Sequence, residues 1–391
     1  MDIEQVLNKI DDQEIVRLCR DLVRINTTNP PGDERTAAEY IAKHIQSYGF
    51  EINYVSHSKR RASLIARLPG RGSQPAVVFN GHTDVVPVGS EKWKHPPFDG
   101  VVEDGKIWGR GSADMKGGLA AMMVAASAIA KAKIPLNGDF ILMATAGEEI
   151  NMFGARAIAE MPGPKNWQAL IISEPTYNRL GLAERGVFWI KITTHGKTAH
   201  GSTPELGKNA IEMMRILLNE IEKLKIPFTS HPILGNFSLS INTIQGGVQT
   251  NVVPDSCAIT IDMRTLPGQS HPRILEQFEQ LIVQLNQQDH NFRVSIEVIN
   301  DLPAAETNAE NPVVNIFKNS IELISQHPAE TLKLPYATEA AVFVPALQVP
   351  TLVFGPGNNI LAHQPDEFVE IEKMVEAAKI YAVAAIQMLA S

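Results

Sequence analysis

The sequence predicts an α/β protein, in which a mostly parallel sheet flanked by helices is interrupted by a smaller inserted α+β domain. Three observations support this fold class. Apolar runs suited to buried strands alternate with helical patterns in the first 180 residues. Strands of alternating polarity dominate the middle of the chain, and apolar runs return after residue 300. A chain of 391 residues with 44% hydrophobic content can bury two cores.

The first segment alternates helices and apolar strands. Amphipathic helices are predicted over about residues 11–24 and 34–48, and further helical patterns cover 116–131 and 154–160. Four apolar runs suit buried strands: "SLIARL" (63–68), "AVVFNGH" (76–82), "DFILMATA" (139–146) and "ALIISEP" (169–175). Because strands and helices alternate, we expect a largely parallel sheet with helices on both faces.

The middle segment has a different order of elements. Its strands are "VFWIKITTHG" (187–196), "FSLSINTIQGG" (237–247), "SCAITIDMRTL" (256–266) and "RVSIEVI" (293–299), with helices at about 208–225 and 272–288. The resulting βαββαβ order describes a compact two-layer module. We therefore assign residues 181–300 to an inserted domain, and residues 1–180 and 301–391 to one discontinuous α/β domain.

Charge and composition exclude several classes of protein. A net charge of -8 and a pI of about 5.8 argue against nucleic acid or an anionic membrane as the main partner. The acidic start lacks the apolar core of a signal peptide. The longest apolar stretch, Leu119–Ala130, would span only roughly 18 Å as a helix, too short for a bilayer. Cys19 and Cys257 form no CxxC, so neither a disulfide framework nor a thiolate zinc site is expected. A soluble cytoplasmic protein is predicted.

Side chains that bind metals recur where the apolar runs end. They are His82 and Asp84 in "GHTD", Glu148 and Glu149 in "TAGEE", Glu174 in "SEP", and Asp114 just before a helix in "GRGSADMKGG". Sites in open α/β sheets form beyond the carboxyl ends of the strands. We therefore expect His82, Glu149 and Glu174 to converge. Asp114 can join them from its helix start, and His363 in "GNNILAHQPDEF" is a further candidate.

Each of these residues also has a structural interpretation. Asp114 fits a helix N-cap equally well, and His363 alone is typical of a surface loop. The spacing of Thr145 and Glu148 matches a capping box, which would explain one glutamate but not its neighbour. Taken together, two histidines and three acids form the ligand set expected for two zinc-like ions.

Chain geometry suggests distinct roles within this set. Asp114 is the best candidate for a carboxylate that bridges two cations, since its side chain is short and it follows a tight turn. Asp84 lies on the same side of an extended chain as His82 and can orient its imidazole. Glu148 and Glu149 are adjacent and point apart. One of them should therefore bind metal, while the other takes a proton from water.

The chain resembles the di-zinc amidohydrolase family that contains acetylornithine deacetylase, succinyl-diaminopimelate desuccinylase, aminoacylases and glutamate carboxypeptidase. The resemblance runs nearly end to end, through "GHTDVVP", "GRGSADMKGG", "TAGEE", "SEP", "GKTAHGSTPELGKNAI", "TNVVPDSCAITIDMR" and "GPGNNILAHQPDEF". It implies a zinc-peptidase-like catalytic domain (1–180 and 301–391) and an inserted domain (181–300) that forms a homodimer.

The resemblance also implies a role for each matching residue. His82 and Glu174 match ligands of one zinc, with Asp84 behind the histidine, and Asp114 matches the bridging aspartate. The cofactor implied is two Zn²⁺ per subunit, although such ligands also accept Co²⁺ or Mn²⁺.

Four further positions complete the implied active site. Glu149 and His363 match the ligands of the second zinc, and Glu148 matches the general base. His200, in "GKTAHGS", matches a histidine that reaches the active site of a neighbouring subunit. The implied reaction is hydrolysis of an amide by zinc-activated water.

The substrate is predicted from fewer residues. Arg185, Asn251 and Arg264 match positions that contact substrate in the family, although a surface salt bridge explains either arginine equally well. "PYATEAAVF" most resembles the "TEA" segment of acetylornithine deacetylases, and Glu339 there would suit the amine of ornithine. The alternative for Glu339 is a structural acid at a helix start. N²-acetylornithine is therefore the first prediction.

Other activities remain open. A succinyl-diaminopimelate desuccinylase, a carboxypeptidase or a dipeptidase of the same family would share every metal ligand. A catalytically inactive metal-binding relative is the alternative from another class, and the presence of Glu148 and all ligands argues against it.

Overall fold

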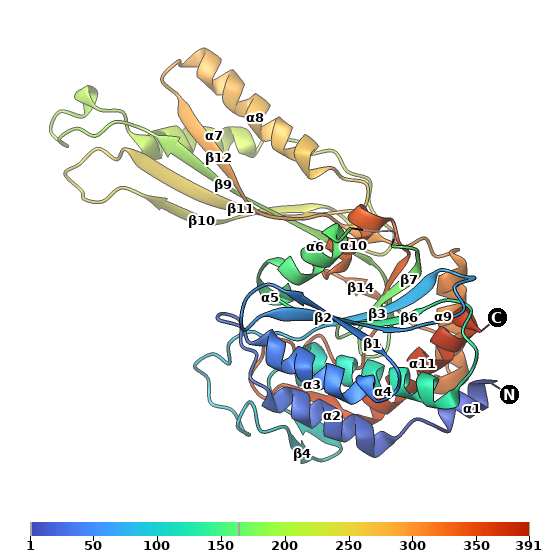
Figure 1. Ribbon diagram of the computed structural model, residues 1–391. Coiled ribbons are helices and arrows are strands. Elements are labelled where there is room, and N and C mark those ends of the chain that lie inside the picture. The colour runs from blue at the N-terminus through green and yellow to red at the C-terminus, as the bar shows by residue number, and fades with distance from the viewer. Residues whose placement is uncertain (1, 163–164, 391) are drawn as a thin grey trace. The chain divides into compact units, whose positions relative to one another are not determined.

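The computed structural model describes residues 2–162 and 165–390, which form two compact units (Figure 1). Unit 1 contains the residues up to Leu182, Glu306–Lys333 and the residues from Thr338 onward. Unit 2 contains Ala183–Ala305 and Leu334–Ala337. The predicted boundaries at 180 and 300 lie slightly before these, and residues 334–337 were not assigned to the inserted domain.

Unit 1 is built on a mixed sheet in the order β1-β2-β6-β3-β7-β15-β8-β13, with β14 beside β8. The four central strands are parallel. The bounds are β1 (Glu51–Ser56), β2 (Ala62–Leu68), β3 (Ala76–His82), β6 (Phe140–Thr145), β7 (Trp167–Ile172), β8 (Leu180–Glu184), β13 (Ala305–Glu306), β14 (Thr331–Leu334) and β15 (Thr351–Val353). The parallel centre, flanked by helices, confirms the predicted α/β class.

The edges of this sheet are antiparallel. β1 pairs with β2, and β2 with β6, in antiparallel register. Only residues 57–61 separate β1 from β2. A link of this length can form a hairpin but not the crossover of a dozen residues that parallel neighbours require.

Helices cover both faces of the sheet, as Figure 1 shows: α2, α3, α4 and α11 lie on one face, and α6 and α10 on the other. The helices of unit 1 are α1 (Asp2–Leu7), α2 (Asp12–Arg24), α3 (Glu34–Gln46), α4 (Gly117–Ala132), α5 (Glu148–Asn151), α6 (Phe153–Glu160), α9 (Pro312–Ser325), α10 (Ala340–Leu347) and α11 (Ile371–Leu389). A small sheet of β4 (Val101–Glu103), β5 (Lys106–Trp108) and β16 (Phe368–Glu370) lies apart from the main one.

The helix α4 is apolar on nearly every side. Together with the preceding turn it forms one run, Ser112–Ala132, which is long and apolar enough to span a membrane by length and composition. This run is longer than the apolar stretch 119–130 noted in the sequence, and 94% of its apolar window is buried. Burial between the sheet and α11 accounts for its Ala and Met content, because small or flexible side chains allow close packing.

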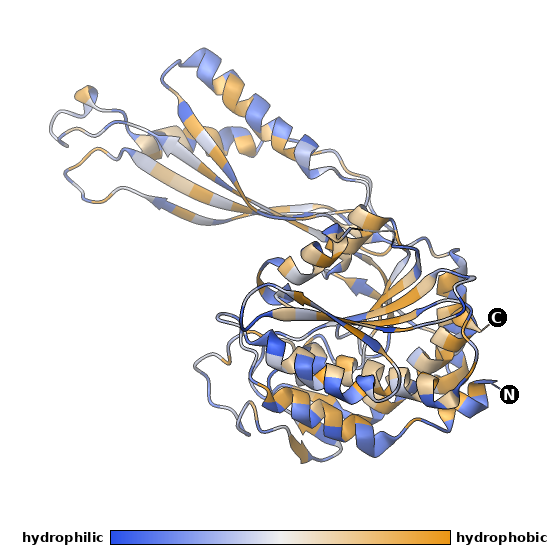
Figure 2. Ribbon diagram, viewed as in Figure 1, coloured by the Kyte–Doolittle hydropathy of each residue, from blue (hydrophilic) through white to orange (hydrophobic). Residues whose placement is uncertain are grey.

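Unit 2 has the predicted βαββαβ order. Its elements are β9 (Gly186–His195), a short 3₁₀ turn (Pro204–Leu206), α7 (Ala210–Ile221), β10 (Ser238–Gly246), β11 (Ser256–Thr265), α8 (His271–Gln288) and β12 (Arg293–Leu302). The four strands form an antiparallel sheet in the order β10-β11-β9-β12. In Figure 2, α8 alternates hydrophobic and hydrophilic residues, as expected of a helix with one face on a core.

Candidate active site

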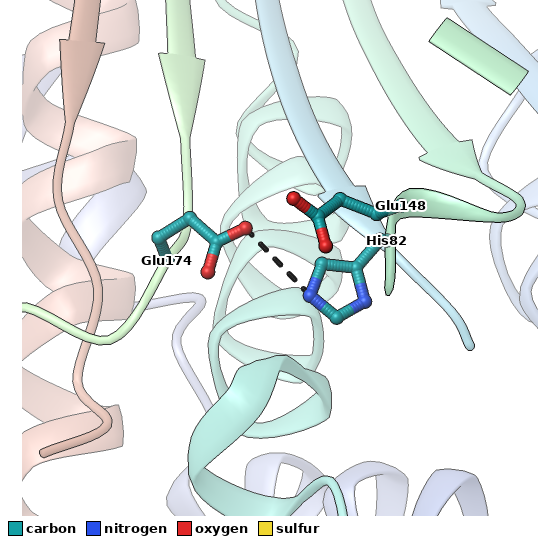
Figure 3. Close-up of side chains that lie close together, drawn as sticks. All are labelled: His82, Glu148 and Glu174. Atoms are coloured by element: carbon teal, nitrogen blue, oxygen red, sulfur yellow. Dashed lines mark ion pairs between the residues drawn. The ribbon is translucent and has the colours of Figure 1, made fainter. Parts of the chain in front are cut away.

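The parallel strands of unit 1 bring their carboxyl ends together. β3 pairs with β6 so that His82 lies opposite Thr145, and with β7 so that Asn80 lies opposite Ile172. His82 is the last residue of β3, Glu148 begins α5 after β6, and Glu174 follows β7. Figure 3 shows the side chains of His82, Glu148 and Glu174 pointing toward one another. Glu149 lies in a second group with His82 and Asp114, so the predicted neighbours His82, Glu149 and Glu174 lie at the same edge of the sheet.

Asp114 lies between two groups of candidate ligands. Its Oδ1 atom is 3.0 Å from His82 Nε2, and its Oδ2 atom is 3.4 Å from His363 Nε2. Each histidine has a carboxylate of its own. His82 Nε2 is 3.6 Å from Glu174 Oε1, and His363 Nε2 is 3.1 Å from Glu149 Oε2. The two oxygens of one carboxylate thus face two separate His–Glu pairs.

The local chain explains how Asp114 reaches this position. It lies in the turn Ser112–Lys116 with non-helical angles (φ -122°, ψ 93°). Gly111 precedes it with φ 84°, a left-handed conformation that favours glycine. Asp114 therefore does not cap α4, and the N-cap interpretation of this residue is wrong.

Burial and like charges dominate the electrostatics of this cluster. Burial raises the pKa of Glu148 and of Glu174 well above the usual range, and the negative charges of Glu174 and Asp114, respectively, raise them further. Hydrogen bonds to Asp114 and Glu149 raise the pKa of His363 to about 10. Burial opposes ionisation of Asp114, but its hydrogen bonds with His363 and His82 hold its pKa below the usual value.

These residues fit divalent cations. Glu174 Oε1 is buried and has no hydrogen-bond partner among the described residues. The crowded carboxylates repel one another, and a cation would offset that repulsion. Imidazole nitrogens with carboxylate oxygens are the donor set that Zn²⁺, Co²⁺ and Mn²⁺ accept. The Nδ1 atom of His82 lies 3.0 Å from the backbone carbonyl of Asp84, so Nδ1–H donates and Nε2 is free to face the cluster.

The carboxylate of Asp84 does something that the sequence did not suggest. Its oxygens accept hydrogen bonds from the backbone N–H groups of Gly147 (2.9 Å), Glu148 (3.1 Å) and Glu149 (3.2 Å), and from Asn29 Nδ2 (2.8 Å). By contrast, its Oδ1 atom is 3.8 Å from the imidazole of His82. Asp84 orients the imidazole through its carbonyl and the two glutamates through its carboxylate.

Asp84→Asn is expected to lower the free energy of unfolding of the metal-free protein by about 3 kcal/mol. The amide keeps the size of the side chain but loses acceptor capacity, and each buried donor left unpaired costs about 1–3 kcal/mol. Urea denaturation of the two proteins measures the difference. A loss below about 1 kcal/mol would show that these N–H groups do not depend on Asp84.

The capping box considered for Thr145 and Glu148 is absent. Thr145 Oγ1 donates to Glu339 Oε2 at 2.7 Å, and the N-cap of α5 is Gly147. Glu339 is fully buried and also accepts from Asn80 Nδ2. It is the N-cap residue of α10, but its side chain makes no capping hydrogen bond. Burial raises the pKa of Glu339 to about 7. Only its Oε2 atom has hydrogen-bond partners among the described residues, and a contact of Glu339 with substrate stays a prediction.

Glu339→Gln is expected to flatten the pH dependence of stability. The pKa of Glu339 is higher in the folded chain than its ordinary 4.5, so the folded protein binds the proton more tightly. The stabilisation is complete below pH 4.5 and is lost as the pH rises to about 7. Across that window, metal-free wild type should lose on the order of 3 kcal/mol relative to the variant, since one pKa unit is about 1.4 kcal/mol.

Urea denaturation at several pH values checks this prediction, with Glu310→Gln as the control because Glu310 is exposed. Parallel pH profiles for wild type and Glu339→Gln would contradict it.

The other predicted site residues belong to unit 2. His200 is exposed and its Nδ1 atom is 2.7 Å from Ser202 Oγ. Arg185 donates to the carbonyls of Leu234 and Asn236, both at 2.8 Å. Their roles at the cluster in unit 1 stay predictions.

Asn251 and Arg264 also lie in unit 2. Asn251 is exposed, and its carbonyl accepts from the N–H of Gly201. Arg264 pairs with Asp262, with Nε 2.9 Å from Oδ1. For Arg264, the structure thus shows an ion pair of the kind considered as the alternative to substrate binding.

Sequence reasoning missed four residues that support the cluster: Asn29, Asn80, Arg110 and Glu367. Arg110 and Glu367 lie inside the motifs "GRGSADMKGG" and "QPDEF". One basic and one acidic residue in motifs already assigned to the site was a usable signal, because charged side chains near a buried site are seldom left unpaired.

Comparison with known proteins agrees with this geometry. The pattern described as "Peptidase family M20/M25/M40" matches residues 78–387, which include every member of the cluster. A probable succinyl-diaminopimelate desuccinylase of Staphylococcus epidermidis is 30% identical over 400 aligned positions, covering 95% of this chain and 97% of the relative.

Solved structures share the fold at lower identity. Aminopeptidase PepT of Bacillus cereus superposes with a TM-score of 0.78 at 21% identity, covering 97% of this chain and 99% of that one. The YXEP protein of Bacillus subtilis, a dinuclear metal binding peptidase from the M20 family, superposes with a TM-score of 0.71 at 18% identity, covering 97% and 98%. With a family pattern that spans most of its length, the chain belongs to peptidase family M20/M25/M40.

Proposed function

We propose that the protein is a metal-dependent amidohydrolase that cleaves the amide bond of an N-acyl amino acid and binds two divalent cations, Zn²⁺ first among them. The observation that carries this proposal is the position of Asp114 between the two His–Glu pairs. His82 and Glu174 would hold one cation, His363 and Glu149 the other, and Asp114 both. The YXEP protein of B. subtilis, a dinuclear metal binding peptidase of similar fold, supports the same number of ions.

The cations would polarise the amide carbonyl and make a water molecule more acidic. Glu148 acts as the proton carrier in this proposal. Its carboxylate lies beside His82 and Glu174, at the start of the turn that Asp84 holds. From there it can take a proton from the attacking water and deliver it to the leaving amine.

Two acyl groups have separate support. The curated relative from S. epidermidis is named a probable succinyl-diaminopimelate desuccinylase, which favours a succinyl substrate. The "TEA" segment of the sequence favours N²-acetylornithine. Because the succinyl group is supported by a curated relative over nearly the whole chain, and the acetyl group by one short segment, we place the succinylated substrate first and acetylornithine second.

We also propose a homodimer through unit 2. The edge strand β10 has exposed residues along most of its length, including Ile241 and Ile244, and its outer edge pairs with no strand in the described part of the chain. Such an edge is a surface on which another strand can pair. Sedimentation equilibrium should give a mass of two chains, and a single-chain mass at micromolar concentration would contradict the dimer.

The activity test uses protein that is stripped of metal and reloaded with Zn²⁺, Co²⁺ or Mn²⁺. N-succinyl-diaminopimelate, N²-acetylornithine and a dipeptide are then compared by the release of free amine. We expect metal-dependent hydrolysis that is fastest with the succinylated substrate. If acetylornithine or the dipeptide is hydrolysed faster, that compound replaces the succinylated one as the proposed substrate. No hydrolysis by protein carrying two metal ions per chain would overturn the enzymatic function.

A further inference from the structure

A buried ion pair joins the two loops that carry Asp114 and His363. Arg110 lies four residues before Asp114, and Glu367 lies four residues after His363. Their side chains are 2% and 0% exposed, and Arg110 Nη1 is 2.6 Å from Glu367 Oε2. In the described part of the chain, their other hydrogen bonds go to backbone groups and not to the side chains of the candidate ligands.

Glu367 holds the turn of Asp114. Its Oε1 atom accepts hydrogen bonds from the backbone N–H groups of Ala113 (2.9 Å) and Asp114 (3.1 Å), and its Oε2 atom accepts from Gly111 (3.0 Å). Three backbone groups of the turn that presents the shared carboxylate are thus bound to one side chain from the His363 loop.

Arg110 holds the loop of His363 in return. Its Nη2 atom donates to the backbone carbonyl of His363 at 3.3 Å, and its Nη1 atom to that of Gln364 at 3.2 Å. The guanidinium also stacks over the ring of Trp93, 5.0 Å from its centroid. Each of the two loops therefore contributes one charged side chain that binds the backbone of the other.

The two His–Glu pairs depend on such contacts to different degrees. His82 and Glu174 lie at or just beyond the ends of β3 and β7, where the ladder of the main sheet sets their spacing. His363 lies in the loop 354–367 between β15 and β16, and its side chain is 52% exposed. Its imidazole contacts Asp114 and Glu149, but the loop itself has no sheet ladder to set the position of its backbone.

We propose that the Arg110–Glu367 pair is a latch that positions His363 relative to Asp114 and so determines the affinity of one of the two cation sites. The proposal rests on the proposed function, because it needs both cations. Arg110 and Glu367 are positioning residues here, and the site formed by His82 and Glu174 should be largely independent of them.

The test measures zinc binding, by competition with a chromophoric chelator, in wild type, Arg110→Lys and Glu367→Gln. Lysine keeps the charge but cannot reach both carbonyls. One of the two binding steps should weaken by about 10–100-fold, as is usual when residues that support a ligand are removed, and the other should change less than about threefold.

Two controls separate the latch from general loss of stability. Glu34→Gln breaks another buried glutamate–arginine pair of unit 1, with Arg61, whose hydrogen bonds contact no candidate ligand. It should leave both binding steps within about threefold of wild type. In a His363→Ala background, which removes the dependent site, Arg110→Lys should change the remaining affinity less than about twofold.

Several results would overturn the latch. The proposal is wrong if both binding steps weaken equally, or if neither latch variant weakens any step. It is also wrong if Glu34→Gln has the same effect as the latch variants. If Glu367→Gln does not fold, Arg110→Lys decides the matter by itself. Wild type that binds fewer than two zinc ions would instead contradict the proposed function, and the two failures are therefore distinguishable.

Discussion

Glu148→Gln is expected to retain both metal ions and to lose about 10³-fold in kcat. Glutamine matches the shape of glutamate but cannot accept a proton, and general acid–base catalysis typically contributes about 10²–10⁴-fold. Glu149 groups with His82 and Asp114 and is also paired with His363, whereas Glu148 groups with His82 and Glu174. The proposal gives the metal contact to Glu149 and the proton to Glu148, so the expected loss falls on proton transfer.

Metal content by elemental analysis and kcat on the best substrate check this result together. Glu149→Gln is the matched comparison, since it changes the adjacent residue in the same way and should lose one metal ion. If Glu148→Gln loses metal while Glu149→Gln keeps it, the two glutamates have the opposite roles.

Asp114→Asn is expected to abolish activity by weakening both cation sites at once. One oxygen of Asp114 faces each histidine, and an amide would turn its NH₂ group toward one of the two cations. The variant also removes the negative charge that offsets the repulsion between two cations at close range. We expect each binding step to weaken by about 100-fold or more, at the upper end of what ligand-shell changes cost.

Zinc titration of Asp114→Asn measures the affinity of each binding step, and Glu174→Gln serves as the comparison. Glu174 contacts His82 and not His363, so its variant should weaken one step and spare the other. The fold of metal-free Asp114→Asn should be intact by circular dichroism, because the amide has nearly the same size and shape as the carboxylate. Wild-type affinity at either step would contradict the shared position of Asp114.

The convergence of His82, Glu149 and Glu174 could be predicted because parallel strands end at the same edge of a sheet. The βαββαβ order of unit 2 was equally predictable, since each of its elements has a hydrophobic period of its own. The antiparallel hairpin of β1 and β2 was not predicted, because most residues of β1 are exposed and the strand has no continuous apolar run.

Other features depend on contacts between residues far apart in the chain. Asp84 binds the N–H groups of residues 147–149, more than sixty positions away, and Glu367 binds those of the Asp114 turn, more than 250 away. No local period or motif spacing specifies such a pair. An acid after a buried strand can bind a metal, cap a turn or orient a histidine, and the residue type is the same in all three cases.

By itself, the sequence determined which chemical groups gather at the strand ends, because their residue types and their places after apolar strands are local properties. Only the tertiary structure decided which contacts each of those groups makes. Asp114 faces both histidines, the carboxylate of Asp84 holds the turn of the two glutamates, and Glu339 is fully buried. These distinctions are hydrogen bonds between distant segments, and such bonds exist only once the sheet has brought the segments together.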